Sequence, residues 1–125
     1  MSAHIETGKS GESMALSWLR ERGFTILHHN WRWSYYELDI IATKVHPHRH
    51  GPKTFLHFIE VKTRYSERYG FPEESVGKKK VRNVKRAADA YLQKHPGHRW
   101  IRFDILSIVL KGKSEASYFL LEDIG

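Results

Sequence analysis

Apolar residues recur along the chain with two different periods, and these periods predict where helices and strands form. A spacing of three and four residues, typical of a helix with one buried face, occurs in two segments, Ser10–Arg22 and Lys78–His95. Runs rich in aromatic and β-branched residues, typical of strands, occur in Phe24–Trp31, Tyr36–Thr43, Phe55–Arg64, Trp100–Leu110 and Tyr118–Leu121. This order predicts an α/β fold, in which a mixed central sheet of about five strands is flanked by two helices.

The second predicted helix lies between the third and fourth predicted strands, so it forms a crossover connection and these two strands should be parallel. Ser10 is the expected N-cap of the first helix, and Gly23 is its expected end. The sequence of 125 residues has no internal repeat and no linker, so residues 1–125 are expected to form a single domain.

Composition narrows the class of protein. The absence of cysteine excludes disulfides and thiolate metal sites, and no apolar run is long enough to span a bilayer. The polar N-terminus lacks a signal-peptide core, so we expect a cytoplasmic protein without a membrane partner. Lys and Arg number 21 against 14 Asp and Glu, and the resulting net charge of +7 favours a polyanionic partner such as DNA.

Charged residues interrupt the central predicted strand, Phe55–Arg64. Glu60 and Lys62 are two residues apart, so they share the strand face that also carries Leu56 and Phe58. Charges beside an apolar run are costly to bury unless they are paired or bound. One interpretation is a salt bridge at the strand end; the other is a metal ligand next to a lysine that is catalytic or stabilises charge.

A second acidic strand, Tyr36–Thr43, favours the metal interpretation. Alternation places Glu37, Asp39 and Ile41 on one face, and it places Leu38, Ile40 and Ala42 on the other. If this strand pairs with Phe55–Arg64, Asp39 and Glu60 could share one face, and two carboxylates suit Mg²⁺ or Mn²⁺. Glu37 could be a supporting or a structural residue.

Several cations and aromatic residues could contact nucleic acid. Positive charge at a helix start opposes the helix dipole, so a phosphate partner would explain the cluster Lys78, Lys79, Lys80 and Arg82, although a solvated face is the alternative. Arg64 and Arg68 follow the central strand and are further candidates for phosphate contacts. The aromatic residues Trp31, Trp33, Tyr35 and Tyr36 could stack on bases, but sheet packing explains most of them. Prolines and a glycine near His46, His48 and His50 favour a hairpin loop over a metal site.

The ordered set of motifs resembles the YraN-like family of predicted endonucleases, within the PD-(D/E)xK nuclease superfamily that includes Holliday-junction resolvases. The resemblance rests on Glu37-Leu38-Asp39 followed by Ile59-Glu60-Val61-Lys62-Thr63-Arg64, and it extends from Gly8–Glu12 to Arg102-Phe103-Asp104. It implies a restriction-endonuclease-like core. The family usually has Gly where this chain has Tyr36.

The resemblance also implies roles for single residues. Asp39 and Glu60 would bind Mg²⁺ or Mn²⁺, with the Val61 carbonyl as a further ligand. Glu12, on the first helix, would complete the acidic cluster, and Lys62 would orient or activate water or neutralise charge on the phosphate.

The function expected from these roles is that of a metal-dependent endonuclease that hydrolyses DNA phosphodiester bonds. The preferred DNA structure stays open, branched DNA included, and a homodimer would suit cutting of symmetric junctions. The alternatives are a catalytically inactive nucleic-acid-binding module and, with less support from the charge, a protein-interaction scaffold. Salt dependence separates them, because nucleic-acid binding weakens steeply with salt.

Overall fold

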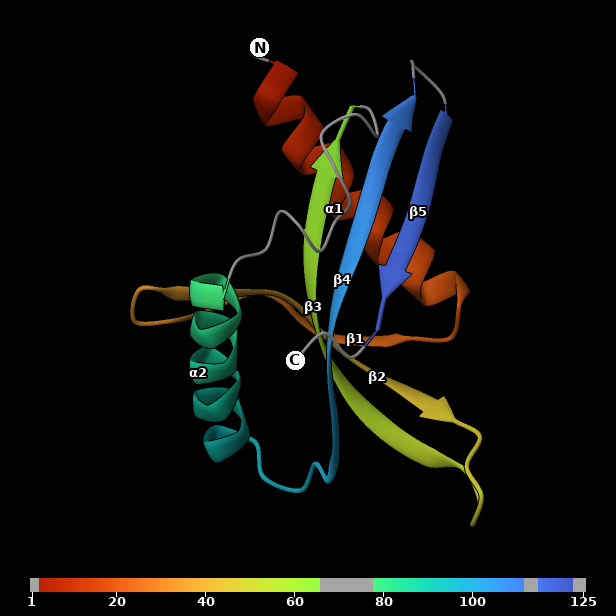
Figure 1. Ribbon diagram of the computed structural model, residues 1–125, viewed down its shortest axis with the longest axis vertical. Helices are drawn as coiled ribbons and strands as arrows, with labels where there is room; N and C mark the ends of the chain where they lie inside the picture. The colour runs from red at the N-terminus through yellow and green to blue at the C-terminus, as the bar shows by residue number, and fades with distance from the viewer. Residues whose placement is uncertain (1–2, 66–77, 112–114, 123–125) are drawn as a thin grey trace.

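The computed structural model describes residues 3–65, 78–111 and 115–122; the side chains of residues 3–10 and of Lys78 lie outside this description. It confirms the α/β fold, with a mixed five-stranded sheet and two helices (Figure 1). In chain order the elements are α1 (Ala3–Glu21), β1 (Thr25–Trp33), β2 (Tyr36–His46), β3 (Lys53–Arg64), α2 (Lys78–Lys94), β4 (Trp100–Lys111) and β5 (Glu115–Leu121).

The strands lie in the sheet in their sequence order, β1-β2-β3-β4-β5. The pairs β1–β2, β2–β3 and β4–β5 are antiparallel, and the pair β3–β4 is parallel. The parallel pair is the one that α2 connects, as predicted, because only a crossover can return the chain to start a neighbouring strand in the same direction.

The two helices cover opposite faces of the sheet (Figure 1). Consecutive residues of β3 show this, because Phe58 belongs to the core under α2 and Ile59 to the core under α1. The α1-side core consists of Ala15, Leu19, Phe24, Ile40, Ala42, Ile59, Leu106 and Ile108. The α2-side core consists of Leu38, Ile41, Leu56, Phe58, Ala87, Ala88 and Tyr91. The α1 side and the α2 side are used below in this sense.

Helix α1 begins earlier than the sequence indicates. It starts at Ala3, so Ser10 lies inside the helix and is not its N-cap. The helix can extend this far because no proline lies between Ala3 and Ser10. Gly11 is buried in a close contact with β3, where an added Cβ atom would clash with Oγ1 of Thr63. This close approach fixes the first half of α1 over the end of β3, near the predicted site.

The faces of β2 do not alternate strictly, which corrects one prediction. Ile40 and Ala42 lie on the α1 side as a pair, but Leu38 lies on the α2 side together with Ile41. The alternation breaks at Asp39, between Leu38 and Ile40. In β1, the partners of these two residues flank Asn30, whose φ is 53°. A left-handed residue re-aims a strand, as at a β-bulge.

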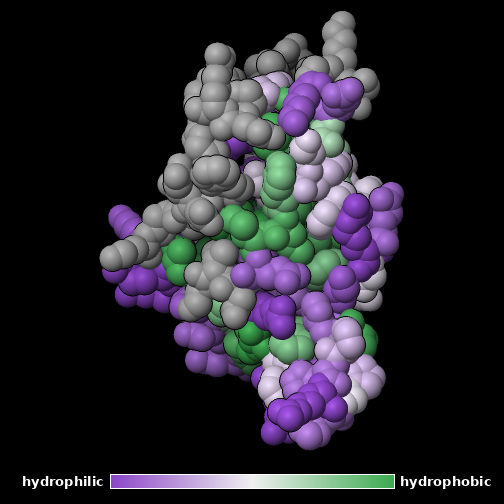
Figure 2. Space-filling view, turned by 45° about the vertical axis from the view of Figure 1, so that its right-hand side comes forward, coloured by the Kyte–Doolittle hydropathy of each residue, from purple (hydrophilic) through white to green (hydrophobic). Residues whose placement is uncertain are grey.

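The β2–β3 hairpin is longer than predicted, because paired strands extend to His46 and resume at Lys53. Its hydrophilic tip forms the lower end of the molecule in Figure 2. The histidine-rich stretch is therefore a hairpin, as the sequence favoured. Strand β5 also begins earlier than predicted, at Glu115. In the part of the chain that the structure describes, no helix is long and apolar enough to cross a membrane.

Candidate active site

Asp39 lies where β2 and β3 separate. The last residue pair between these strands is Ile40 with Ile59, and Asp39 comes directly beyond it. The backbone N–H of Val61 donates a hydrogen bond to Oδ2 of Asp39 at 2.8 Å. The carboxylate therefore occupies the opening between the strands and replaces the strand hydrogen bond that ends there.

Glu60 belongs to the α2 side of β3 and is only 8% exposed. Its Oε1 lies 3.1 Å from Nζ of Lys80, in the first turn of α2. The salt bridge that the sequence offered as one interpretation thus exists, but its cation comes from the helix and not from Lys62. Asp39 and Glu60 are named the carboxylate pair below.

The pKa of Asp39 is strongly raised, from an ordinary value of 3.8 to about 7. Burial is the main cause, and the negative charge of Glu60 is the second. The hydrogen bond from Val61 and the charge of Lys80 act in the opposite direction. Two nearby carboxyl groups resist simultaneous ionisation, and a cation placed between them removes that resistance. The carboxylate pair therefore has the electrostatic character of a cation-binding site.

Lys62 accompanies Glu60 on β3. Val61, between them, packs against the α1-side core, so strand alternation directs Glu60 and Lys62 toward the α2 side. Lys62 is half-buried, and within the described part of the chain it makes no ion pair. Lys62 therefore lies on the same side of β3 as Glu60.

Glu12 is not brought into the expected acidic cluster. The described residues contain no group of three or more His, Cys, Asp or Glu side chains placed to hold a metal ion. Glu12 is also not among the charges that shift the pKa of Asp39. The physical reason is that α1 covers the face of β3 opposite to Glu60. The periodicity of a helix does not show which face of a sheet that helix covers.

Glu37 is held away from the carboxylate pair by a cation of its own. Its Oε2 lies 3.3 Å from Nη2 of Arg32, its cross-strand partner in β1. Glu37 makes only the smallest contribution to raising the pKa of Asp39. This ion pair favours the structural role, one of the two roles that the sequence left open.

The cations predicted to contact phosphate are distributed differently. Lys79 and Arg82 are exposed on α2, whereas Lys80 is engaged by Glu60. Arg64 ends β3 and is half-buried. Arg68 and the side chain of Lys78 lie outside the described residues.

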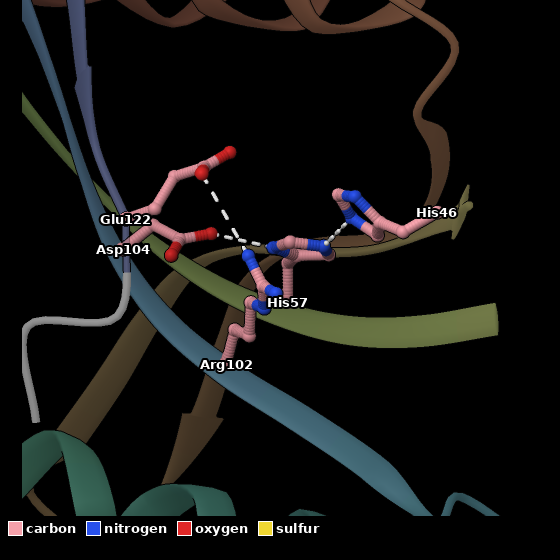
Figure 3. Close-up of polar contacts among 5 residues, drawn as sticks. All are labelled: His46, His57, Arg102, Asp104 and Glu122. Carbon is pink, nitrogen blue, oxygen red and sulfur yellow. Dashed lines mark hydrogen bonds and ion pairs between the residues drawn. The ribbon is translucent and has the colours of Figure 1, made fainter. Parts of the chain in front are cut away.

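A buried polar chain on the α1 side was not assigned any role from the sequence. Oδ2 of Asp104 lies 2.5 Å from Nδ1 of His57, and both side chains are fully buried. The other ring nitrogen of His57 lies 2.9 Å from Nε2 of His46. Figure 3 shows His57 between its two partners, with the ion pair of Arg102 and Glu122 beside it. The sequence signal for this chain was the presence of two ionisable residues, His57 and Asp104, inside predicted buried strands.

This polar chain fastens the long β2–β3 hairpin to β4. Asp104 belongs to β4, His57 to β3 and His46 to the end of β2. Burial, followed by the positive charges of His57, Arg102 and Lys44, lowers the pKa of His46, against a smaller opposing effect of Glu122. This polar chain lies on the face of the sheet opposite to Glu60, and it links three strands.

Comparison with known proteins gives a consistent family. The model of the family described as "Uncharacterised protein family UPF0102" matches residues 11–108. Proteins named "UPF0102 protein" are similar over most of their length. The one from Phocaeicola vulgatus is 39% identical over 124 residues, covering 99% of this chain and 93% of its own. The one from Dictyoglomus thermophilum is 42% identical over 106 residues, covering 84% of this chain and 83% of its own.

Proposed function

The chain belongs to the uncharacterised protein family UPF0102, and we propose that it is a divalent-metal-dependent endonuclease that hydrolyses phosphodiester bonds of DNA. The observation that carries the proposal is the carboxylate pair, in which Asp39 has its pKa raised to about 7 beside Glu60. Strongly perturbed carboxyl groups next to lysines are typical of sites that do chemistry.

The donor set fits Mg²⁺ or Mn²⁺. Mg²⁺ is usually held by one or two carboxylates together with waters and substrate phosphates, so a cluster of three protein side chains is not required. Asp39 and Glu60 would supply the two carboxylates, and the Val61 carbonyl is a further candidate ligand. Such an ion would lower the pKa of bound water and polarise the phosphate. Glu12 has no ligand role in this proposal.

The remaining side chains stabilise charge. Lys80 presents its ammonium group to Glu60, and Lys62 lies on the same side of β3, so an incoming phosphate would meet the first and could be reached by the second. Lys62 would orient the attacking water or neutralise charge that develops on the phosphate. Lys80 keeps Glu60 ionised, since a cation at 3.1 Å favours the carboxylate form.

Motif order and fold together favour the PD-(D/E)xK nuclease superfamily. Asp39 lies in the second strand and Glu60 and Lys62 in the third, and the mixed sheet is flanked by two helices, as expected for a restriction-endonuclease-like core. Within this proposal the protein works in the cytoplasm, where chromosomal DNA is available, and a homodimer would allow paired cuts.

The direct test is a cleavage assay on a panel of labelled DNA structures: duplex, nicked duplex, flap, single strand and four-way junction. We expect cleavage of at least one of them with Mg²⁺ or Mn²⁺ and none with a chelator. Glu60→Gln should reduce the rate at least ~100-fold while circular dichroism stays unchanged, because it removes charge but little volume. Glu37→Gln is the matched control and should leave cleavage near the wild-type rate.

Binding without cleavage would support the alternative, a catalytically inactive nucleic-acid-binding module. The basic composition favours that alternative over a scaffold. If the wild type cleaves no member of the panel with either metal, but binds DNA with strong salt dependence, the nuclease proposal is wrong and the binding module stands.

The exposed start of α2 should supply phosphate contacts. Replacing Lys79 and Arg82 by Ala should weaken DNA binding at low salt and reduce the slope of log K against log salt by about one to two. Anisotropy across a salt series measures this slope. Lys111→Ala, an exposed cation at the end of β4, is the control and should leave the slope unchanged. An unchanged slope in the double variant would mean that DNA lies elsewhere.

A further inference from the structure

A groove separates the tip of the β1–β2 hairpin from α2. Its volume is about 290 Å³, at the lower end of the range for small-ligand pockets. We name it the aromatic groove; it is lined by Trp33, Arg86, Asp89, Ala90, Gln93 and Lys94. In Figure 1 the β1–β2 connection passes beside α2 on the left. The size suits one ring-sized ligand and is too small for a folded segment of another protein.

The aromatic wall of the groove is held in place from behind. Trp33 stacks on Tyr36 with ring centroids 5.7 Å apart and an interplanar angle of 24°. Nη1 of Arg86 lies 3.4 Å from the hydroxyl oxygen of Tyr36, to which it donates a hydrogen bond. Trp33 nevertheless stays 36% exposed, and Tyr35, in the turn, is 99% exposed. An indole with this support and exposure offers a stacking surface at small entropic cost.

The rest of the lining is mostly polar and includes two cations and one carboxylate. Arg86 and Lys94 bring positive charge to the two ends of the groove wall on α2, and Lys94 also lies 5.8 Å from the ring of Trp31. Asp89 and Gln93 add a carboxylate and an amide, which can accept from and donate to the edge of a base. A stacking ring, hydrogen-bonding groups and nearby cations are the components of single-strand recognition.

The aromatic groove is close to the carboxylate pair along two independent paths. On β2, Asp39 lies three positions after Tyr36, which stacks on Trp33, a distance of about 10 Å along the strand. On α2, Arg86 lies six positions after Lys80, a rise of about 9 Å. Helix α2 thus contacts the hairpin through Arg86 and the carboxylate pair through Lys80. A few nucleotides span this separation.

We propose that the aromatic groove binds one unpaired nucleobase of a DNA strand, and that this selects DNA with a single-stranded segment over fully paired duplex. A base inside a duplex has both faces stacked and its pairing edge occupied, so it cannot enter. The selection of cleavage substrates rests on the proposed nuclease function, whereas base binding by the groove does not.

The test is the affinity of wild type and Trp33→Ala for a labelled single-stranded oligonucleotide and for a hairpin-closed duplex, in chelator. We expect Trp33→Ala to weaken single-strand binding about 5- to 100-fold, the effect of losing one stacked base, and to change duplex binding less than about 2-fold. Trp33→Phe should restore most of the affinity. Phe119→Ala, at a position 44% exposed on β5, is the matched control and should change neither affinity.

Equal losses on both DNAs, or no loss on either, would overturn the proposal. Thermal melting of Trp33→Ala, and recovery in Trp33→Phe, separate lost stacking from lost structure. Because no cleavage is needed, the two hypotheses fail separately. A groove effect in a protein that never cleaves rejects only the nuclease, and cleavage without a groove effect rejects only base binding.

Discussion

Asp39→Asn should make the protein more stable at pH 8 and remove its response to divalent metal. In the folded protein the pKa of Asp39 is about 7, against an ordinary value of 3.8. Between these values the folded state binds more protons than the unfolded state, so stability falls as pH rises through this window. Above it, the folded protein carries the full unfavourable effect of a buried, repelled carboxylate.

Asparagine removes that charge and retains the oxygen that accepts from Val61 at 2.8 Å. A shift of about three units corresponds to at most about 4 kcal/mol, and some of it is lost with the attraction to Lys80. We therefore expect a gain of roughly 1–3 kcal/mol at pH 8 and almost none at pH 4. Urea unfolding at both pH values measures the difference.

The same substitution should abolish stabilisation by metal. Mg²⁺ or Mn²⁺ that binds only the folded state raises the melting temperature of the wild type, by mass action, and should leave Asp39→Asn unchanged. Cleavage should fall to the chelator background. Glu37→Gln is the control, because its partner Arg32 is exposed and the expected change is below about 1 kcal/mol. A gain in stability over the wild type that is no larger at pH 8 than at pH 4 would contradict this interpretation of the site.

Much of the fold follows from the sequence because its signals are local. Phe55–Arg64 is apolar and β-branched, and a crossover helix follows it, so the parallel pairing with β4 could be predicted. Alternation along β3 also placed Glu60 with Phe58 on one side. Such predictions hold as long as the strand stays regular.

The features that the sequence did not predict depend on how helices and strands pack against one another. Glu60 binds Lys80, which lies 20 positions away, because α2 rests on that face of the sheet, and helix periodicity does not say which strand a helix end contacts. The position of Glu12 depends in the same way on how α1 packs against the sheet. The alternation of β2 breaks at Asp39, opposite the left-handed Asn30 of β1, and the periodicity of β2 alone does not show such a break.

The pairing of His57 with Asp104 should contribute most to the stability of the long hairpin. His57→Leu should destabilise the protein by about 3–5 kcal/mol, because Asp104 loses its imidazole partner while it stays buried. Urea unfolding at pH 7 measures this loss. The apolar surroundings of His57, which include Phe24 at 5.0 Å between ring centroids, should accept leucine without a clash.

The double variant His57→Leu, Asp104→Val separates the pair from the packing. Replacement of a buried ionic pair by apolar residues is often neutral or stabilising, so much of the lost stability should return, with a coupling energy of at least about 2 kcal/mol. His46→Leu, at the half-buried end of the chain, should cost about 1–3 kcal/mol at pH 7, because Nε2 of the buried His57 loses its partner.

Acid should act through the same polar chain. The lowered pKa of His46 means that its stabilising contribution is complete above pH 6.5 and is lost as pH falls through the folded-state value. His46→Leu should therefore be less sensitive to acid than the wild type.

The effects of the two single variants at positions 57 and 104 on the free energy of unfolding could instead add without coupling. In that case the hairpin is held by apolar packing alone, and the buried pair does not stabilise the contact between β3 and β4.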